Sequence, residues 1–294
     1  MEKLKFIAPM MPTLVEQPPE AGEWIHEVKY DGYRTQIILE EGAARAFTRN
    51  GFEWTTKYAL LVNAATQLSV SSAIIDGEVI VTDRESKPDF GALRSAIVTR
   101  PERLTFVAFD LLHLEGHDLR GMELEDRRHL LHDLVEPSDG KIQFSHHVTG
   151  SGADFYRAAD GMGLEGIVSK RPDSVYRSGP TRAWLKIKSY AEEDFEIAGV
   201  LRKRGNAPLA LMATRDGKRT YVGSAIVALN DSMRERLWKR VKEGAGTAPR
   251  GMGKLAAEWT RPGLVGRVRY LRGEERLRHA TLRDFREEYS GDGG

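Results

Sequence analysis

The chain has 294 residues, of which 40% are hydrophobic and 30% charged; this balance is typical of globular proteins and excludes wholesale disorder. It contains no cysteine, which excludes disulfide bonds, cysteine nucleophiles and thiolate zinc sites and favours a cytoplasmic protein. No apolar run reaches the roughly 18 residues that a membrane helix needs. The N-terminal apolar stretch is interrupted by Pro9 and Pro12, so we expect neither a cleaved signal nor membrane association.

The net charge of +1 hides an asymmetry along the chain. Residues 191–294 contain 21 Lys and Arg against 15 Asp and Glu, a net charge of +6, and the preceding residues carry −5. Such a difference indicates that the basic part binds a polyanion. A solvated basic surface without a partner is the alternative.

Hydrophobic patterning predicts two domains of α+β class. The first mixes strands over 25–29, 36–39, 73–81, 105–112, 167–170 and 184–188 with helices over 55–68 and 123–135. The polar segment 189–194 separates it from strands over 195–201, 209–214, 221–229 and 265–271 and a helix over 232–241. Several strands with one helix in about 100 residues fit a small β-barrel such as an OB-fold, and a small sandwich almost as well. We therefore expect domains at 1–189 and 190–294.

One motif combines a lysine with a glycine turn. Lys29 ends a predicted strand in the sequence Lys29-Tyr-Asp-Gly-Tyr-Arg34. Taken alone, this pattern also fits a hairpin whose charges face solvent.

Further charged residues lie on predicted strands, where isolated charges lack partners on a half-buried sheet. Asp76 and Glu78 share one strand face, as do Lys186 and Lys188, because side chains two residues apart in a strand point the same way. Glu165 comes just before an apolar strand that ends at Lys170. These residues supply lysines for phosphates, carboxylates for a divalent metal and a lysine that can act as a nucleophile.

In this order, the motifs resemble those of the covalent nucleotidyltransferases, and more narrowly the ATP-dependent DNA ligases. The matching segments are Lys29–Arg34 (motif I), Thr48-Arg-Asn-Gly51, Phe109-Asp-Leu-Leu112 (motif III), Glu165–Lys170 (motif IV) and Trp184–Lys188 (motif V). They cover nearly the whole first domain and are most similar to the ligase module of bacterial end-joining ligases. The resemblance implies a nucleotidyltransferase (adenylation) domain followed by an OB-fold.

The resemblance also implies roles for single residues. Lys29 would attack ATP and become lysyl-AMP, and Lys186 and Lys188 would neutralise charge on the attacked phosphate. Phe109 would stack on adenine, although an ordinary core aromatic fits this position nearly as well. The remaining implied contacts are Glu27 near the adenine amine, Arg34 and Arg49 on ribose or the DNA 5′-phosphate, Lys170 and Glu78 in nucleotide binding, and Glu165, Glu78 and Asp76 around the metal.

The implied cofactors are ATP and Mg²⁺, with Mn²⁺ as an alternative metal. The implied partner is nicked or broken duplex DNA, which the basic second domain would clamp through phosphate contacts. A Ku-like end-binding protein is a further candidate partner, and a monomer is the expected state.

The sequence departs from the family pattern near its C-terminal end. The family's motif VI has the form R-x-D-K, whereas here Arg286 is followed by Glu288 and Tyr289 in place of Asp and Lys. Losing that lysine puts self-adenylylation in doubt and leaves the later sealing steps intact, unless Arg278 or Arg283 compensates.

Two other functions remain open from the sequence. An RNA ligase or an RNA-capping guanylyltransferase uses the same domain, and GTP preference or RNA ends would favour that alternative. A non-catalytic nucleic-acid-binding protein is the other, but the presence of Lys29, Glu165, Lys186 and Lys188 argues against a decayed site.

Overall fold

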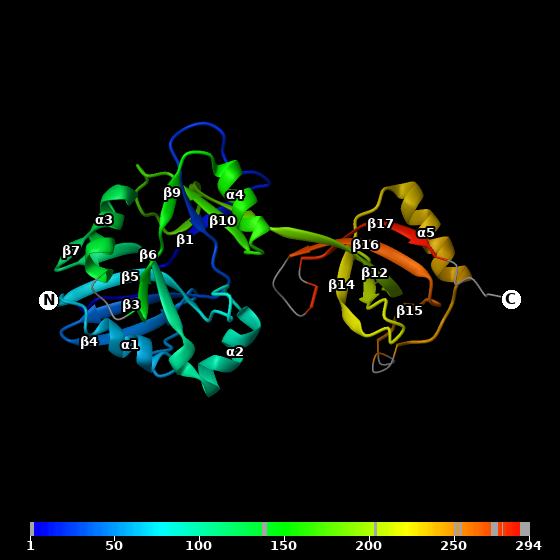
Figure 1. The fold of residues 1–294 in the computed structure, drawn as a ribbon, viewed down its shortest axis with the longest axis horizontal. Coiled ribbons are helices and arrows are strands. Elements are labelled where there is room, and N and C mark those ends of the chain that lie inside the picture. The colour runs from blue at the N-terminus through cyan, green and yellow to red at the C-terminus, as the bar shows by residue number, and fades with distance from the viewer. Residues whose placement is uncertain are drawn as a thin grey trace. The chain divides into compact units, whose positions relative to one another are not determined.

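The structure is a computed structural model that describes residues 3–136, 140–202, 205–249, 252, 255–271, 276–277 and 279–288. The chain divides into two compact units, Met1–Ser189 and Tyr190–Gly294 (Figure 1). Among the described helices, none combines the length and the apolar character that crossing a bilayer requires.

Two sheets form the frame of the first unit. One has the strand order β1-β11-β10-β2-β9, and the other has the order β4-β3-β5-β6-β7, with β8 paired to β6. Both sheets contain parallel and antiparallel pairs. The first sheet is made of β1 (Met10–Leu14), β2 (Ile25–Val28), β9 (His147–Thr149), β10 (Gly166–Lys170) and β11 (Gly179–Lys188). The second is made of β3 (Tyr33–Glu40), β4 (Ala43–Thr48), β5 (Ser72–Ile80), β6 (Thr105–Leu114), β7 (His117–Asp118) and β8 (Ile142–Phe144).

Helices cover these sheets. The unit contains α1 (Ala59–Ala65), α2 (Phe90–Thr99), a short 3₁₀ helix (Pro101–Arg103), α3 (Leu124–Val135) and α4 (Gly152–Gly161). Helix α3 packs against β6 and β8, whereas α4 packs against β10 and β2. An apolar cluster with members from both sheets, among them Ile25, Ile38, Leu112 and Trp184, joins the sheets. These helices and mixed sheets confirm the α+β class predicted for this part of the chain.

The strand pairing excludes the hairpin that was the alternative for the segment around Asp31-Gly32. The strands on either side of Asp31-Gly32 do not form a hairpin, since β2 pairs with β10 and β9 whereas β3 pairs with β4 and β5. The segment between them crosses from one sheet to the other. This crossing places the end of β2 beside residues of both sheets.

The second unit is a strand-rich body with one long helix. Its elements are β12 (Tyr190–Leu201), β13 (Leu209–Ala213), β14 (Tyr221–Val227), α5 (Asp231–Glu243), β15 (Glu258–Trp259), β16 (Leu264–Leu271) and β17 (Thr281–Glu287). The strand order is β13-β14-β17-β16-β12-β15, and an additional pairing of β13 with β12 closes five of the strands into a ring. The apolar core of this unit lies inside the ring and under α5.

Candidate active site

Lys29 follows β2 directly and is held against the start of β10. Its backbone N–H donates to the carbonyl of Gly166 at 2.9 Å. Both nearby glycines are required by close packing of backbone: a Cβ on Gly32 would lie 2.3 Å from the carbonyl oxygen of Val79, and one on Gly166 would lie 2.0 Å from that of Ile187. Gly166 also has a φ of +139°, which disfavours other residues. These close approaches bring Lys29 next to Glu165.

Glu165 lies between two lysines. The Lys29 ammonium forms an ion pair with Glu165 Oε2, and Lys188 Nζ lies 3.6 Å from Oε1. The Glu165 side chain is 6% exposed, whereas those of Lys29 and Lys188 are 20% and 16% exposed. We call these three residues the lysine–glutamate cluster. Its cations remain in reach of solvent and of a bound molecule.

The lysines on β11 are perturbed by burial and by each other. Burial, together with the charges of Lys188, Lys29 and Arg49, lowers the pKa of Lys186. Burial also lowers the pKa of Lys188, against the opposing charge of Glu165. Crowded cations of this kind favour an anionic ligand, because phosphate oxygens relieve their mutual repulsion.

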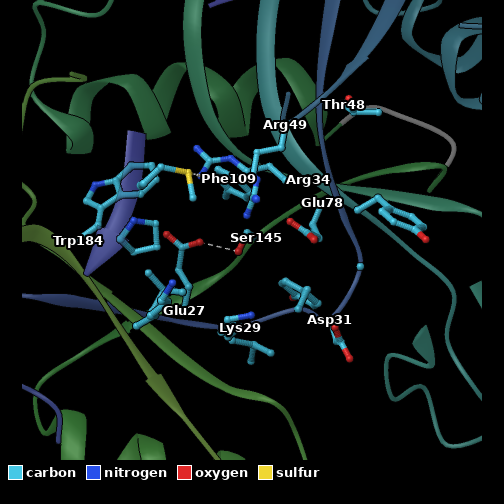
Figure 2. A pocket seen from close by; sticks show the side chains of 18 of the residues that line it. Glu27, Lys29, Asp31, Arg34, Thr48, Arg49, Glu78, Phe109, Ser145 and Trp184 are labelled. Atoms are coloured by element: carbon cyan, nitrogen blue, oxygen red, sulfur yellow. Dashed lines mark hydrogen bonds between the residues drawn. The ribbon is translucent and has the colours of Figure 1, made fainter. Parts of the chain in front are cut away.

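A pocket with a volume of about 520 Å³ opens beside Lys29 and Lys186 (Figure 2). It is lined by residues of both sheets, among them Glu27, Arg34, Arg49, Glu78, Phe109, Lys170 and Trp184. Arg49 is exposed at this pocket. The pocket therefore collects most of the sequence-predicted site residues; Asp76, Glu165 and Lys188 lie outside its lining.

The aromatic wall of the pocket is formed by Phe109 and Trp184. Their rings pack edge to face, with centroids 6.1 Å apart. Lys170 Nζ lies 4.6 Å from the Phe109 centroid and 4.4 Å from that of Trp184. An aromatic face next to a cation is a suitable platform for a planar base.

Glu27 projects into the pocket from β2 and is buried (Figure 2). Lys170 Nζ lies 2.7 Å from its Oε1, and Ser145 Oγ donates to its Oε2 at 2.7 Å. Burial acts to raise the pKa of Glu27, but the charges of Lys170 and Arg128 outweigh it and hold that pKa below its usual value. Glu27 is therefore an ionised hydrogen-bond acceptor inside a pocket. Lys170, in turn, is committed to Glu27.

Arg34 is committed to protein partners. Its Nε and Nη2 donate to the two carboxylate oxygens of Asp76 at 3.1 and 2.8 Å, and its Nη1 donates to the Met10 carbonyl at 2.7 Å. The Tyr176 hydroxyl donates to Asp76 Oδ2 at 2.8 Å and accepts from the Met10 N–H. This closed ring of contacts fixes β1 against β5. It favours a positioning role for Asp76 over a metal-ligating one. It also indicates that Arg34 shapes the pocket.

Glu78 is the carboxylate of β5 that faces the pocket (Figure 2). Burial raises its pKa to about 8, against the opposing charges of Lys29 and Arg34. The protonated form therefore dominates at neutral pH until a cation binds nearby.

The described residues contain no cluster of three or more His, Asp or Glu side chains arranged to hold a metal ion. Glu165 and Glu78 are two carboxylates near the same lysine, as their interactions with Lys29 show. Mg²⁺ is commonly held by one or two carboxylates with phosphate oxygens and waters. This donor set therefore fits a magnesium ion that arrives with a nucleotide.

The residues of the altered motif VI are partly described. The Arg286 guanidinium pairs with Asp194 at 2.7 Å and with Glu288 at 2.7 Å, and Arg215 lies 2.5 Å from Glu288. These partners all belong to the second unit. Arg283 is exposed, and Tyr289 and Arg278 lie outside the described residues.

Sequence reasoning missed three residues that support the pocket. Arg128 and Ser145 contact Glu27, and Tyr176 contacts Asp76. Their partners are 101, 118 and 100 positions away in the chain. Arg128 lies in a charged amphipathic helix, where it has no local signal that separates it from its exposed neighbours.

Comparison with known proteins agrees with this geometry. A family model for the ATP dependent DNA ligase domain matches residues 9–188. The chain is 36% identical over 281 residues to the multifunctional non-homologous end joining protein LigD of Pseudomonas aeruginosa, covering 90% of this chain and 33% of that protein. It is 29% identical over 294 residues to LigD of Mycobacterium tuberculosis, covering 91% of this chain and 36% of that protein. The chain thus spans about a third of the length of these relatives.

Solved structures show the same likeness. The ligase domain of Mycobacterium tuberculosis LigD matches with a TM-score of 0.60 and 28% identity, covering 95% of this chain and 94% of that one. A mycobacterial DNA ligase D complexed with ATP and MES matches with a TM-score of 0.59 and 27% identity, covering 96% and 95%. Together with the motif order and the pocket geometry, these matches show that the chain belongs to the family of ATP-dependent DNA ligases.

Proposed function

We propose that this chain seals nicks and breaks in duplex DNA through a lysyl-AMP intermediate formed on Lys29, in bacterial end joining. The observation that supports this proposal most directly is the placement of the Lys29 ammonium against Glu165, at the edge of a pocket that offers a base platform and further cations. The motif order and the family membership agree with it.

In the first step, neutral Lys29 Nζ attacks the α-phosphorus of ATP. A P–N bond forms, the bond from that phosphorus to the oxygen bridging to the β-phosphorus breaks, and pyrophosphate leaves. The lysine must first lose a proton, which can pass to solvent because its side chain is partly exposed. Lys186 and Lys188 stabilise the negative charge on the attacked phosphate.

In the second step, AMP passes from Lys29 to the 5′-phosphate of the DNA. A phosphate oxygen of the DNA attacks the AMP phosphorus, a pyrophosphate linkage forms, and the P–N bond to Lys29 breaks, so that Lys29 leaves as an amine that has taken up a proton from solvent. In the third step, the 3′-hydroxyl attacks the DNA phosphate, the phosphodiester bond forms and AMP leaves. Arg49 is exposed at the pocket and suits the 5′-phosphate, because a guanidinium binds phosphate oxygens in pairs.

Different residues are assigned to the adenine base and to the metal ion. Phe109 stacks on adenine, and Glu27 accepts a hydrogen bond from the adenine amine, with Lys170 holding Glu27 in place. Glu165 and Glu78 would hold Mg²⁺ or Mn²⁺ together with phosphate oxygens, and the bound ion would neutralise phosphate charge. Asp76 and Arg34 keep the pocket wall in position.

The proposal extends to the fold and the DNA contacts of the second unit. The ring of five strands and its helix support an OB-fold domain at 190–294, after a nucleotidyltransferase domain at 1–189. Its net positive charge suits sequence-independent contacts with DNA phosphates. We further propose a cytoplasmic monomer that acts with a Ku-like end-binding protein, since the relatives are named for non-homologous end joining.

A denaturing gel of end-labelled, singly nicked duplex DNA incubated with the protein, ATP and Mg²⁺ tests this function. A full-length sealed strand is the expected product and would show that the altered motif VI is tolerated. A strand extended by one AMP would mean that only the first two steps work. An unchanged strand, with parallel GTP and RNA-nick reactions that yield product, would replace the proposal with an RNA-directed enzyme.

A further inference from the structure

Arg128 lies behind the wall of the nucleotide pocket. It belongs to α3, is buried, and lines a second cavity of about 330 Å³ together with His129, His132 and His147. It does not line the 520 Å³ pocket beside Lys29. Any effect of Arg128 on a nucleotide must therefore pass through another residue.

Three residues of the pocket lining accept hydrogen bonds from Arg128: Glu27 through its side chain, and Phe109 (at 3.3 Å) and Ser145 through their backbone carbonyls. Of these three contacts, the one with Glu27 orients a side chain that can bond a base. Arg128 Nη1 donates to Glu27 Oε1 at 2.8 Å across 101 positions of sequence. Both side chains are 3% exposed. A charge-assisted hydrogen bond between two buried groups strongly restricts the orientation of the carboxylate.

Arg128 is itself held from several sides. Its Nη2 donates to the Ser145 carbonyl at 2.6 Å and to His147 Nδ1 at 3.1 Å. Its guanidinium carbon lies 4.6 Å from the centroid of the Phe144 ring. The guanidinium is therefore a fixed anchor, and the same backbone segment that holds it also supplies the Ser145 hydroxyl to Glu27.

The three contacts divide the two oxygens of Glu27. Oε1 is shared by Arg128 and Lys170, whereas Oε2 receives one hydrogen bond from the described residues, that of Ser145. A carboxylate oxygen can accept more than one hydrogen bond. Oε2 therefore keeps acceptor capacity for a ligand, and it points in a direction set by the contacts on Oε1.

We propose that Arg128 is a positioning residue for base selection: it fixes Glu27 so that the pocket favours purines carrying a 6-amino group over purines with a 6-oxo group or no substituent. An ionised carboxylate accepts a hydrogen bond from an amine, whereas it repels the carbonyl oxygen of a 6-oxopurine. This inference rests on the proposed function, in which the pocket binds ATP with its base near Glu27.

The neighbouring Arg127 provides a matched control. It lies on the same helix and is completely buried, but its Nε and Nη2 bind Asp110 at 2.8 Å each. Its further hydrogen bonds within the described part of the chain go to the carbonyls of Met122 and Ser174, away from Glu27. Arg127→Met therefore removes a similar buried ion pair without touching the base contact.

The test measures single-turnover formation of lysyl-nucleotide, detected as added mass on Lys29, with ATP, ITP and purine riboside triphosphate, which lacks the 6-amino group. We expect the wild-type protein to prefer ATP over purine riboside triphosphate by about tenfold or more, the range of one hydrogen bond to a charged group. Arg128→Met should bring this ratio close to one, mainly through a loss with ATP. Arg127→Met should leave the ratio at the wild-type value.

Ser145→Ala is the second variant, because Arg128→Met removes a buried charge and can impair folding. It deletes only the hydroxyl on Oε2 and should lower the ATP preference by about threefold to tenfold. An unchanged ratio in a folded Arg128→Met protein, with all three nucleotides slowed equally, would overturn the proposal in favour of a purely structural role. An unchanged ratio in Ser145→Ala would do the same if Arg128→Met does not fold.

The failure of the proposed function has a different signature. If Lys29→Ala still labels, or if wild-type protein labels with none of the three nucleotides and also fails to seal a nick that already carries AMP on its 5′-phosphate, the proposed lysyl-nucleotide chemistry is wrong. The base-selection proposal fails on its own only when wild-type protein labels on Lys29 and the ratios do not change.

Discussion

Two clusters in the first unit share one charge pattern, a buried glutamate flanked by two cations. In the lysine–glutamate cluster, Glu165 lies between Lys29 and Lys188. In the second cluster, Glu27 lies between Lys170 and Arg128. Lys29 and Glu27 come from the same short stretch of chain, two residues apart, and both line the pocket.

The clusters differ in how far their cations are withdrawn from solvent. Lys29 and Lys188 are 20% and 16% exposed, whereas Lys170 and Arg128 are each 3% exposed. A partly exposed ion pair can exchange partners at modest cost, but breaking a buried one leaves an uncompensated charge. The first cluster is therefore suited to reaction steps in which the glutamate and the lysine must separate. The second is suited to holding one fixed geometry.

Of the variants that test this comparison, Lys29→Ala should cause the largest loss of activity, because it removes the nucleophile. We expect AMP attachment to fall to background while the protein stays folded, since the side chain is partly exposed. Labelling with ATP radioactive in the α-phosphate, followed by a denaturing gel, measures this directly. Binding of nicked DNA should remain nearly unchanged, and persistent labelling would refute the nucleophile assignment.

Glu165→Gln should have the next largest effect. It keeps the shape of the side chain but removes the charge that pairs with Lys29 and that we assign to the metal. Loss of one preorganised electrostatic partner commonly costs about 10²–10³-fold in rate. Single-turnover ligation at several Mg²⁺ concentrations measures the loss. A rate within threefold of wild type, at the same Mg²⁺ dependence, would remove Glu165 from the reaction.

Glu78→Gln tests the effect of burial on a carboxyl group beside the lysine–glutamate cluster. The folded-state pKa of Glu78 is raised to about 8 from 4.5, so between these values the folded state keeps a proton that the unfolded chain has released. Wild-type stability should therefore fall as pH rises from about 5 to 9, and the variant should lack this contribution.

Thermal unfolding without nucleotide or metal measures the difference between the two proteins. We expect Glu78→Gln to match wild type near pH 5 and to exceed it near pH 9 by up to about 5 kcal/mol, equivalent to roughly ten degrees or more in melting temperature. The same difference between the proteins at both pH values would show that Glu78 is not held protonated.

Phe109→Leu should have the smallest effect. It removes the aromatic face next to Lys170 but keeps most of the apolar volume. Loss of base stacking of this kind costs about 1–3 kcal/mol, so the apparent affinity for ATP should fall by about tenfold while the rate at saturating ATP changes little. Titration of lysyl-AMP formation against ATP concentration separates the two quantities. A loss confined to the saturated rate would place Phe109 outside base binding.

The sequence alone determined which chemistry the chain carries. The glycine turn after Lys29, the paired lysines of β11 and the carboxylate before β10 are local patterns, because each reflects a requirement within a few residues: a close backbone approach, a shared strand face, or a strand end. The predicted helices and most of the strands also follow from patterns within one segment, as the apolar residues of α1, α3 and β5 do.

Only the tertiary structure decided how these residues pair. The segment at Asp31-Gly32 reads as a hairpin from its own residues, yet strand pairing with distant segments separates β2 and β3 into different sheets. Asp76 fits a metal ligand from its strand position, but Arg34 and the distant Tyr176 occupy both of its oxygens. Arg128 and Ser145 reach Glu27 from more than 100 positions away. Such partners depend on which buried charges come together when the chain folds, and no periodicity within one segment contains that information.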